Sequence, residues 1–133
     1  MRGLITALVS AAPQRAPEVP PAESAQAWPA RAIKIVVPAP PGGAIDLIAR
    51  VVGDKLATSL GQPVIIDNRP GASGNIGTSM IARAKPNGYT IGLGNFGPMS
   101  VNKALYGSNL PFDPEQDLQP IALIERGAMA LGV

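Results

Sequence analysis

The sequence contains neither cysteine nor histidine among its 133 residues. The absence of thiols excludes disulfides, thiolate metal ligands and a cysteine nucleophile. The absence of imidazole removes the usual base beside a serine or cysteine nucleophile, and also the usual nitrogen ligand of zinc. Any acid–base chemistry would therefore depend on carboxylates alone.

Aromatic residues are also scarce, at 4%, and neither sign of charge dominates, because 11 Lys and Arg face 9 Asp and Glu. The basic residues are scattered along the chain. A nucleic-acid surface needs them clustered and accompanied by aromatic side chains that stack on bases. Because the basic residues are scattered and aromatic residues are few, we expect no nucleic-acid partner. In addition, no apolar run approaches the roughly 18 residues that a membrane-spanning helix needs.

Glycine and proline are abundant instead, with 15 of each, and they separate apolar runs at structured intervals. Hydrophobic residues make up 46% of the chain, which is enough for a packed core. This pattern is typical of a folded domain rather than of low-complexity sequence.

The first 27 residues differ in character from the rest. Arg2 precedes a short apolar run at residues 4–12, a proline-rich stretch follows, and Ala25-Gln26-Ala27 has the small-x-small form of a cleavage site. We expect residues 1–27 to be a secretory signal peptide or, alternatively, a disordered N-terminal segment. Residues 28–133 would then form one small domain or part of a larger one.

Apolar, β-branched stretches between turn residues predict four strands. They cover residues 33–37, 63–66, 89–93 and 121–124. The segments between these strands predict helices, so the order of elements is β-α-β-α-β-α-β. This alternation indicates an α/β domain with a parallel sheet and helices on both of its faces.

The helix predicted for residues 44–60 has the clearest pattern. Its apolar residues recur at spacings of three and four, and Gly61 suits its C-terminal cap. A second helix is expected to begin at Gly74 or Asn75 and to end before Pro86. A short third helix is expected at residues 98–105.

Three glycine-rich loops connect the ends of the first three strands to the helices that follow, at residues 39–43, 69–77 and 94–97. The carboxyl ends of parallel strands lie at one edge of a sheet, so the loops should converge on one crevice. Each loop supplies the free N–H groups and the partial positive charge of a helix N-terminus, and glycine allows close approach of a ligand. The sequence thus predicts an anion site built from backbone amides without a cationic side chain.

A nucleotide site is an alternative interpretation of the same loops. The stretch GLGNFG, residues 92–97, fits G-x-G-x-x-G, and Asp113 lies near the offset of a ribose-binding acid. The context argues against this alternative, because Gly92 falls inside the predicted strand and Pro98 follows the last glycine. No Gly-Lys-Ser/Thr phosphate loop occurs either. A nucleotide-binding domain of an α/β enzyme stays open as the second hypothesis.

Carboxylates give little support for catalysis. Only Asp46 and Asp67 are expected near the crevice, and no pair of acids is spaced for acid–base work. We expect no catalytic residue, no metal site and no cofactor. Asp46 is expected to complement the dipole of its helix. It should also brace the Gly42-Gly43 turn or, alternatively, meet an amino group of an amino-acid ligand. Arg69 is expected to pair with Asp67 rather than to reach an anionic ligand.

Three long stretches carry a resemblance to a known family. They are WPARAIKIVVPAPPGGAIDLIAR, LGQPVIIDNRPGASGNIGTSMIARAKPNGYTIGLGN and NKALYGSNLPFDPEQDLQPIALI. Together they resemble the Bug receptors, the extracytoplasmic solute-binding proteins of tripartite tricarboxylate transporters, over residues 28–133. The sequence departs from the family pattern at Asn87, where aspartate is usual, and at Ala39, where an aromatic residue is common.

The resemblance implies a periplasmic, monomeric binding protein of two lobes that closes on a small carboxylate and delivers it to membrane permease subunits. Known ligands of the family include di- and tricarboxylates, acidic amino acids and aromatic acids. Carried over by motif, the ligand-binding positions are Ala39, Pro41, Gly42, Gly43, Asp46, Asn75, Ile76, Gly77, Thr78, Gly94, Asn95, Phe96 and Gly97.

The length of the chain modifies this expectation. Members of the family are about two domains long, so residues 28–133 are expected to be an incomplete first lobe of a periplasmic binding protein type 2-like fold, without the second lobe. A non-functional truncated product is therefore a further alternative, and a periplasmic adaptor for a signalling kinase is another.

Overall fold

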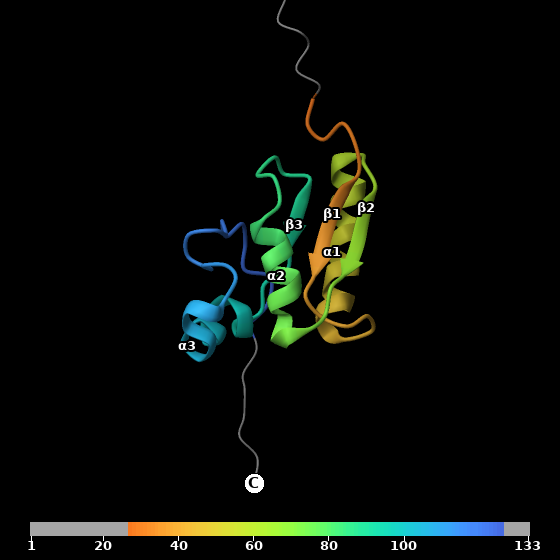
Figure 1. Cartoon of the computed structure of the whole chain (residues 1–133). Coiled ribbons are helices and arrows are strands. Elements are labelled where there is room, and N and C mark those ends of the chain that lie inside the picture. Colours follow the sequence, from red (N-terminus) through yellow and green to blue (C-terminus); the bar gives the residue numbers. More distant parts are fainter. Residues whose placement is uncertain (1–26, 127–133) are drawn as a thin grey trace, which may run out of the picture.

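The computed structural model of the protein describes residues 27–126 (Figure 1). Apart from Ala27, the segment predicted to be a signal peptide lies outside the described residues. Within residues 27–126, no helix combines the length and the hydropathy needed to cross a lipid bilayer.

Three parallel strands form a sheet in the order β2-β1-β3. The strands are β1 (Ile33–Val37), β2 (Val64–Asn68) and β3 (Thr90–Gly92). In the register of the sheet, Ile35 lies opposite both Ile66 and Ile91. β1 is the central strand, and its four aliphatic side chains are buried because both faces of the sheet are covered there.

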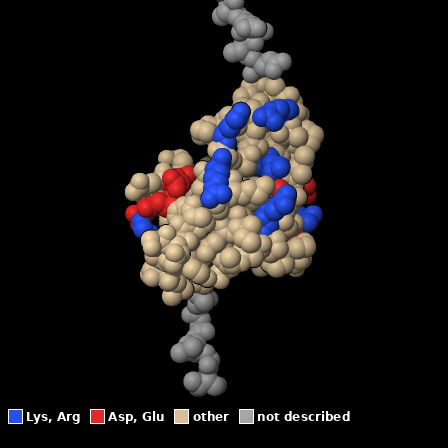
Figure 2. Space-filling view, viewed as in Figure 1, with Lys and Arg blue, Asp and Glu red and all other residues tan. Residues whose placement is uncertain are grey.

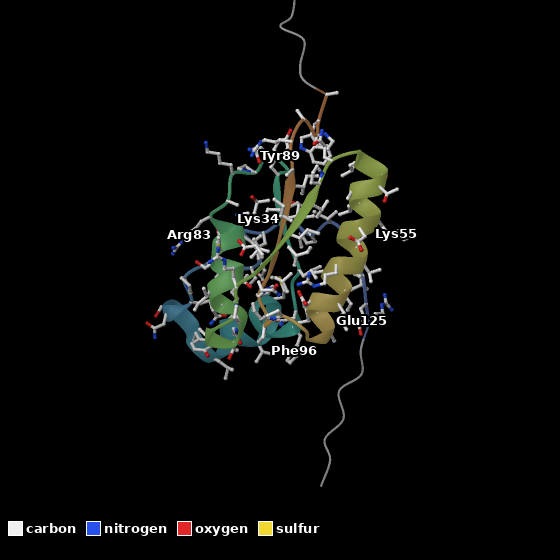
Figure 3. All side chains as sticks on the ribbon, turned by 90° about the vertical axis from the view of Figure 1, so that its right-hand side faces the viewer. Lys34, Lys55, Arg83, Tyr89, Phe96 and Glu125 are labelled. Carbon is white, nitrogen blue, oxygen red and sulfur yellow. The ribbon has the colours of Figure 1, made fainter. Side chains whose placement is uncertain are left out.

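Two helices cover opposite faces of the sheet, as the side view in Figure 3 shows. They are α1 (Ala44–Leu60) and α2 (Asn75–Ala82). α1 packs so closely that a methyl group on Gly53 would lie 3.2 Å from Ile66 and 3.3 Å from Val64. On the other face, Ile81 of α2 fills the space beside Gly92. The predicted α/β architecture, a parallel sheet with helices on both faces, is therefore confirmed.

α1 begins and ends at the residues predicted from its apolar spacing. Gly61 closes it with a left-handed φ of 66°, and its N–H donates to the carbonyl of Ala57 over 3.0 Å. Ala49 is fully buried against Ile35 and Val37 and forms the centre of the core. This packing fixes the start of α1 close to the end of β1.

The second strand runs two residues beyond its predicted end. Asp67 and Asn68 pair with Val36 and Val37, and the N–H of Arg69 donates to the carbonyl of Val37 over 2.7 Å. The prediction ended this strand at residue 66 because the next two residues are polar. β2 lies at an edge of the sheet, however, where polar side chains are tolerated, so the strand continues through them. β3 is shorter than predicted, although the N–H of Leu93 still donates to the carbonyl of Val36.

The third helical region is composite. η2 (Gly97–Val101), a π-helical turn, leads directly into α3 (Asn102–Tyr106), and a 3₁₀ turn, η3 (Gly107–Asn109), follows. These elements lie beside the N-terminus of α2 at the lower end of the molecule in Figure 1. The predicted helix at residues 98–105 is confirmed as a helical segment, with this change of winding inside it.

The predicted fourth strand at residues 121–124 is wrong. The segment has no regular structure, and the side chains of Ile121 and Leu123 are 80% and 69% exposed. Its apolar, β-branched composition suits a strand, but a strand also needs a hydrogen-bonded neighbour, and none of the described strands pairs with it. Composition thus identified a segment with strand propensity that pairs with no strand in residues 27–126.

Candidate ligand-binding site

The loops after β1, β2 and β3 lie at one end of the sheet, as predicted (Figure 1). They surround an open cavity of about 480 Å³. Its walls come from all three loops and from the start of α3: Pro38, Ala39, Pro40, Pro70, Gly71, Ser73, Gly74, Asn95, Phe96, Gly97, Val101 and Asn102. The sheet thus brings together three segments that are distant in the sequence.

Asp46 braces the first loop from the first turn of α1. The side chain is 2% exposed; its Oδ2 accepts hydrogen bonds from the Gly42 N–H over 2.8 Å and from Nε of Arg50 over 3.0 Å. Its Oδ1 accepts from Nδ2 of Asn68 over 3.0 Å, and the same amide lies 3.2 Å from the Ala39 carbonyl. The expected bracing of the Gly42-Gly43 turn is confirmed, and Asn68 extends it to the end of β2.

These donors also set the ionisation of Asp46. The hydrogen bond from Arg50, followed by those from the Gly42 N–H and the Asn68 amide, lowers the pKa of Asp46 to about 2. The carboxyl group is therefore ionised at neutral pH. Asp46 is not among the residues that line the cavity, and its hydrogen bonds brace the first loop.

The second loop has an unusual backbone. Four consecutive residues have positive φ: Gly71 at 119°, Ala72 at 47°, Ser73 at 55° and Gly74 at 89°. For alanine and serine, the left-handed conformation costs about 1–2 kcal/mol per residue. The turn is closed by hydrogen bonds from the Gly74 N–H to the Gly71 carbonyl and from the Asn75 N–H to the Ala72 carbonyl. Neither of these hydrogen bonds uses the amide of Ala72 or Ser73 as its donor.

Asn102 was not among the predicted site residues. It is 3% exposed, and its Nδ2 lies 2.6 Å from Oδ1 of Asn75 and 3.3 Å from the carbonyl oxygen of Ser73. These contacts join α3 to the second loop across 27 and 29 positions of sequence. No local pattern marks such a residue, because its partners are defined only by the fold.

The structure places all thirteen predicted site residues at this end of the sheet, but at different depths. Four of them line the cavity: Ala39, Asn95, Phe96 and Gly97. Asp46, Asn75, Gly77 and Thr78 are buried beneath the loops, whereas Pro41, Gly42, Gly43 and Ile76 are exposed outside the cavity lining. Gly94 packs against Met99, where a methyl group would lie 3.0 Å from the Met99 side chain.

Both helices that begin here lack a side-chain cap. Gly43 precedes α1 and Gly74 precedes α2, and neither position supplies a side-chain acceptor for the first-turn amides. In the described residues, Oδ1 of Asn95 is also buried without a hydrogen-bond partner. The site therefore combines the amide donors at the N-terminus of α2 with a buried side-chain acceptor, Oδ1 of Asn95, whereas the start of α1 lies outside the cavity lining.

No lysine or arginine lines the cavity. Arg69, next to Pro70, instead pairs with Asp67 through a 2.7 Å contact, as predicted, and this pair lowers the pKa of Asp67. Figure 2 shows Lys and Arg spread over the upper part of one face, whereas the lower end, where the loops lie, is nearly uncharged. Recognition of a charged ligand would therefore depend on backbone and neutral polar groups.

A second hollow, of about 420 Å³, lies at the opposite end of the strands. It includes Arg31, Lys34 and Lys85 in its lining and none of the thirteen predicted residues. Its residues precede the strands or begin them, so it receives no helix N-terminus that follows a strand. The cavity at the carboxyl ends of the strands is therefore the candidate site.

A parallel α/β sheet with a glycine-rich cavity at the carboxyl ends of its strands is typical of ligand-binding domains. The comparison with family models defines the class further. The chain belongs to the tripartite tricarboxylate transporter family receptors (TctC), whose model matches residues 48–133. The resemblance derived from the sequence motifs is thereby confirmed.

Several known proteins are similar to this chain in sequence or in structure. Protein BugT of Bordetella pertussis is 43% identical over 102 residues, which are 76% of this chain and 31% of BugT. The structure of MatC from Rhodopseudomonas palustris with bound malate matches with a TM-score of 0.68 and 36% identity, over 72% of this chain and 32% of MatC. Rpa4515 of R. palustris with adipate matches with a TM-score of 0.63 and 39% identity, over 66% of this chain and 29% of that protein.

The chain thus spans about a third of the length of the curated relatives that it matches. The nucleotide alternative finds no support in the geometry, because Gly92 lies in β3 and packs against Ile81 rather than opening a phosphate-binding loop.

Proposed function

We propose that this chain forms part of a periplasmic receptor that binds small organic carboxylates for a tripartite tricarboxylate transporter. The observation that carries the proposal is the cavity between three loops, with the uncapped N-terminus of α2 beside it and no cationic side chain in its lining, in a chain of this receptor family. The solved relatives with malate and with adipate support dicarboxylates as the ligand class.

In this proposal the backbone recognises the carboxylate. The amides of Ala72 and Ser73, together with the N-terminus of α2, would donate to the carboxylate oxygens. Oδ1 of Asn95 is an acceptor and would pair with a donor of the ligand, such as the hydroxyl group of malate, while Phe96, 59% exposed at the cavity wall, would cover the methylene chain. The predicted site residues that do not line the cavity would hold the three loops in the conformation that binds the ligand.

The other parts of the proposal rest on the family. We infer that the chain binds its ligand without chemical conversion and that membrane permease subunits receive it. Residues 28–133 would be part of one lobe, and the periplasm would be the place of action. The receptor family supports each of these inferences.

A titration monitored by amide NMR tests carboxylate binding directly, because it detects weak binding. Malate and adipate are added to the ¹⁵N-labelled chain of 133 residues. We expect fast-exchange shifts of the amides of Ala72, Ser73 and the first turn of α2. Adipamide, which has the same methylene chain without charge, is the control and should leave these signals in place.

The same experiment can overturn the proposal. If neither dicarboxylate shifts the loop amides at tens of millimolar, a carboxylate-binding function for this chain is wrong. If NAD shifts them instead, the site belongs to the nucleotide-binding class.

Replacing Phe96 with alanine is expected to weaken adipate binding more than malate binding. Adipate has the longer methylene chain, and each buried methylene contributes about 0.8 kcal/mol. We expect the dissociation constant for adipate to rise about fivefold, which corresponds to about 1 kcal/mol, and that for malate to change less. The two constants are measured by the same amide titration, and an equal effect on both would contradict the assigned role of Phe96.

A further inference from the structure

Asn102 lies at the first position of α3 and points into the protein rather than into solvent. The side chain contributes to the cavity wall, yet its amide nitrogen is directed at the second loop. An asparagine amide has two hydrogens to donate. Both have acceptors here, Oδ1 of Asn75 and the carbonyl oxygen of Ser73. Asn102 therefore has no donor left for an anionic ligand.

The two acceptors belong to the parts of the loop that most need support. Ser73 and its neighbour Ala72 are the two residues other than glycine that have positive φ in the described chain. Such backbone costs of order 1–3 kcal/mol per residue and persists where the surroundings hold it. Asn75 is the first residue of α2, so the same side chain also fixes where that helix begins.

Neighbouring contacts make this arrangement stiff. Pro98 of η2 packs against Gly74, where a methyl group would lie 2.9 Å from its Cγ. The third loop also approaches the second, because a methyl group on Gly97 would lie 3.6 Å from the carbonyl oxygen of Ser73. Among these contacts, Asn102 supplies the hydrogen bonds that select the direction of the Ser73 carbonyl.

We propose that Asn102 is a positioning residue: it holds the left-handed Ala72-Ser73 turn and the start of α2 so that their amides face a carboxylate. This inference rests on the proposed carboxylate-binding function. Asn102 acts through Ser73 and Asn75 and does not contact the ligand with its amide nitrogen.

The test compares Asn102→Asp and Asn102→Ala with wild type. Aspartate keeps the shape of the side chain but places an oxygen opposite two other oxygens, whereas alanine removes the donor without adding charge. Asn109→Asp is the matched control, because Asn109 is exposed in η3 and makes no side-chain hydrogen bond among the described residues.

The first readout needs no ligand. A residue with positive φ shows a strong nuclear Overhauser effect between its own amide and α protons. We expect this signal for Ala72 and Ser73 in wild type and in Asn109→Asp, and its loss in both Asn102 variants. If Asn102→Ala retains the signal at both residues, the positioning role is overturned, whatever the ligand results. If Asn102→Asp fails to fold, Asn102→Ala alone decides the question.

The second readout is the affinity for malate, measured by the amide titration. We expect the dissociation constant to rise about tenfold in the Asn102 variants, the scale of one lost hydrogen bond, and to be unchanged in Asn109→Asp. Altered loop signals with unchanged affinity would show that Asn102 supports the fold alone, which overturns the inference. If wild type binds no carboxylate, the proposed function itself fails, and the first readout shows separately whether Asn102 holds the turn.

Discussion

Replacing Asp46 with asparagine is expected to destabilise the protein strongly at neutral pH and to loosen the first loop. Both carboxylate oxygens accept hydrogen bonds, Oδ2 from Gly42 and Arg50 and Oδ1 from Asn68. An asparagine amide must turn its NH₂ group toward one of these donors, so at least one hydrogen bond becomes a repulsive contact. We expect Tm to fall by roughly 10 °C, as for the loss of charge-assisted hydrogen bonds in a domain of this size.

The same carboxylate should make the stability of wild type depend on pH. The folded-state pKa of Asp46 is lowered to about 2 from an ordinary value of 3.8. Because the folded pKa is the lower one, the stabilisation is fully present above pH 3.8 and is lost as the pH falls toward 2. Asp46→Asn should lack this part of the pH dependence. Urea unfolding at a series of pH values between 2 and 7 measures it.

Asp54→Asn is the matched control for this prediction. Asp54 lies on the same helix, is exposed, and makes no side-chain hydrogen bond in the described part of the chain. Its replacement should change Tm by a few degrees at most, as expected for an exposed position. Equal effects of the two substitutions would show that the network around Asp46 does not stabilise the loop.

Replacing Gly77 with alanine is expected to be equally disruptive, for a steric reason. A Cβ atom at Gly77 would lie 2.8 Å from the carbonyl oxygen of Arg69 and 2.8 Å from Cα and Cβ of Pro38. Two of these three atoms are backbone atoms at the ends of β1 and β2, so no side chain can rotate away. We expect a net loss of about 2 kcal/mol, because overpacking costs up to about 3 kcal/mol and alanine returns about 1 kcal/mol of helix propensity.

The displacement of α2 should also abolish carboxylate binding in Gly77→Ala, since the helix carries the proposed amide donors. Gly97→Ala is the control for stability, because its nearest neighbour, Oδ1 of Asn95, would lie at an ordinary 3.5 Å. Thermal unfolding of both variants measures the difference. If Gly77→Ala unfolds at the same Tm as wild type, α2 does not approach the ends of β1 and β2 as closely as described.

Local patterns predicted much of this fold because their signals depend on near neighbours. The apolar spacing in α1 and the glycine after it gave both ends of that helix correctly. The motif around Gly42 and Asp46 likewise predicted a braced turn, since Gly42 and Asp46 are only four positions apart. The glycine loops were placed at one end of the sheet by the topology of parallel strands alone.

The failures share a different cause. The segment at residues 121–124 has strand composition, but pairing depends on a neighbouring strand that local sequence does not describe. The end of β2 was misjudged because Asp67 and Asn68 continue the ladder through their pairing with β1. Depth within the site could not be predicted either, since Gly77 and Phe96 carry similar motif signals and yet one is buried and the other exposed.

The sequence by itself determined the family, the alternation of strands and helices, and the absence of thiol and imidazole chemistry, because these follow from composition and short-range order. Only the tertiary structure decided which loop residues face the cavity and which support it from beneath. It also brought Asn102 to Ser73, and Asn68 to Asp46, across more than twenty positions. Contacts of this kind are made by the packing of distant segments, and no local pattern encodes them.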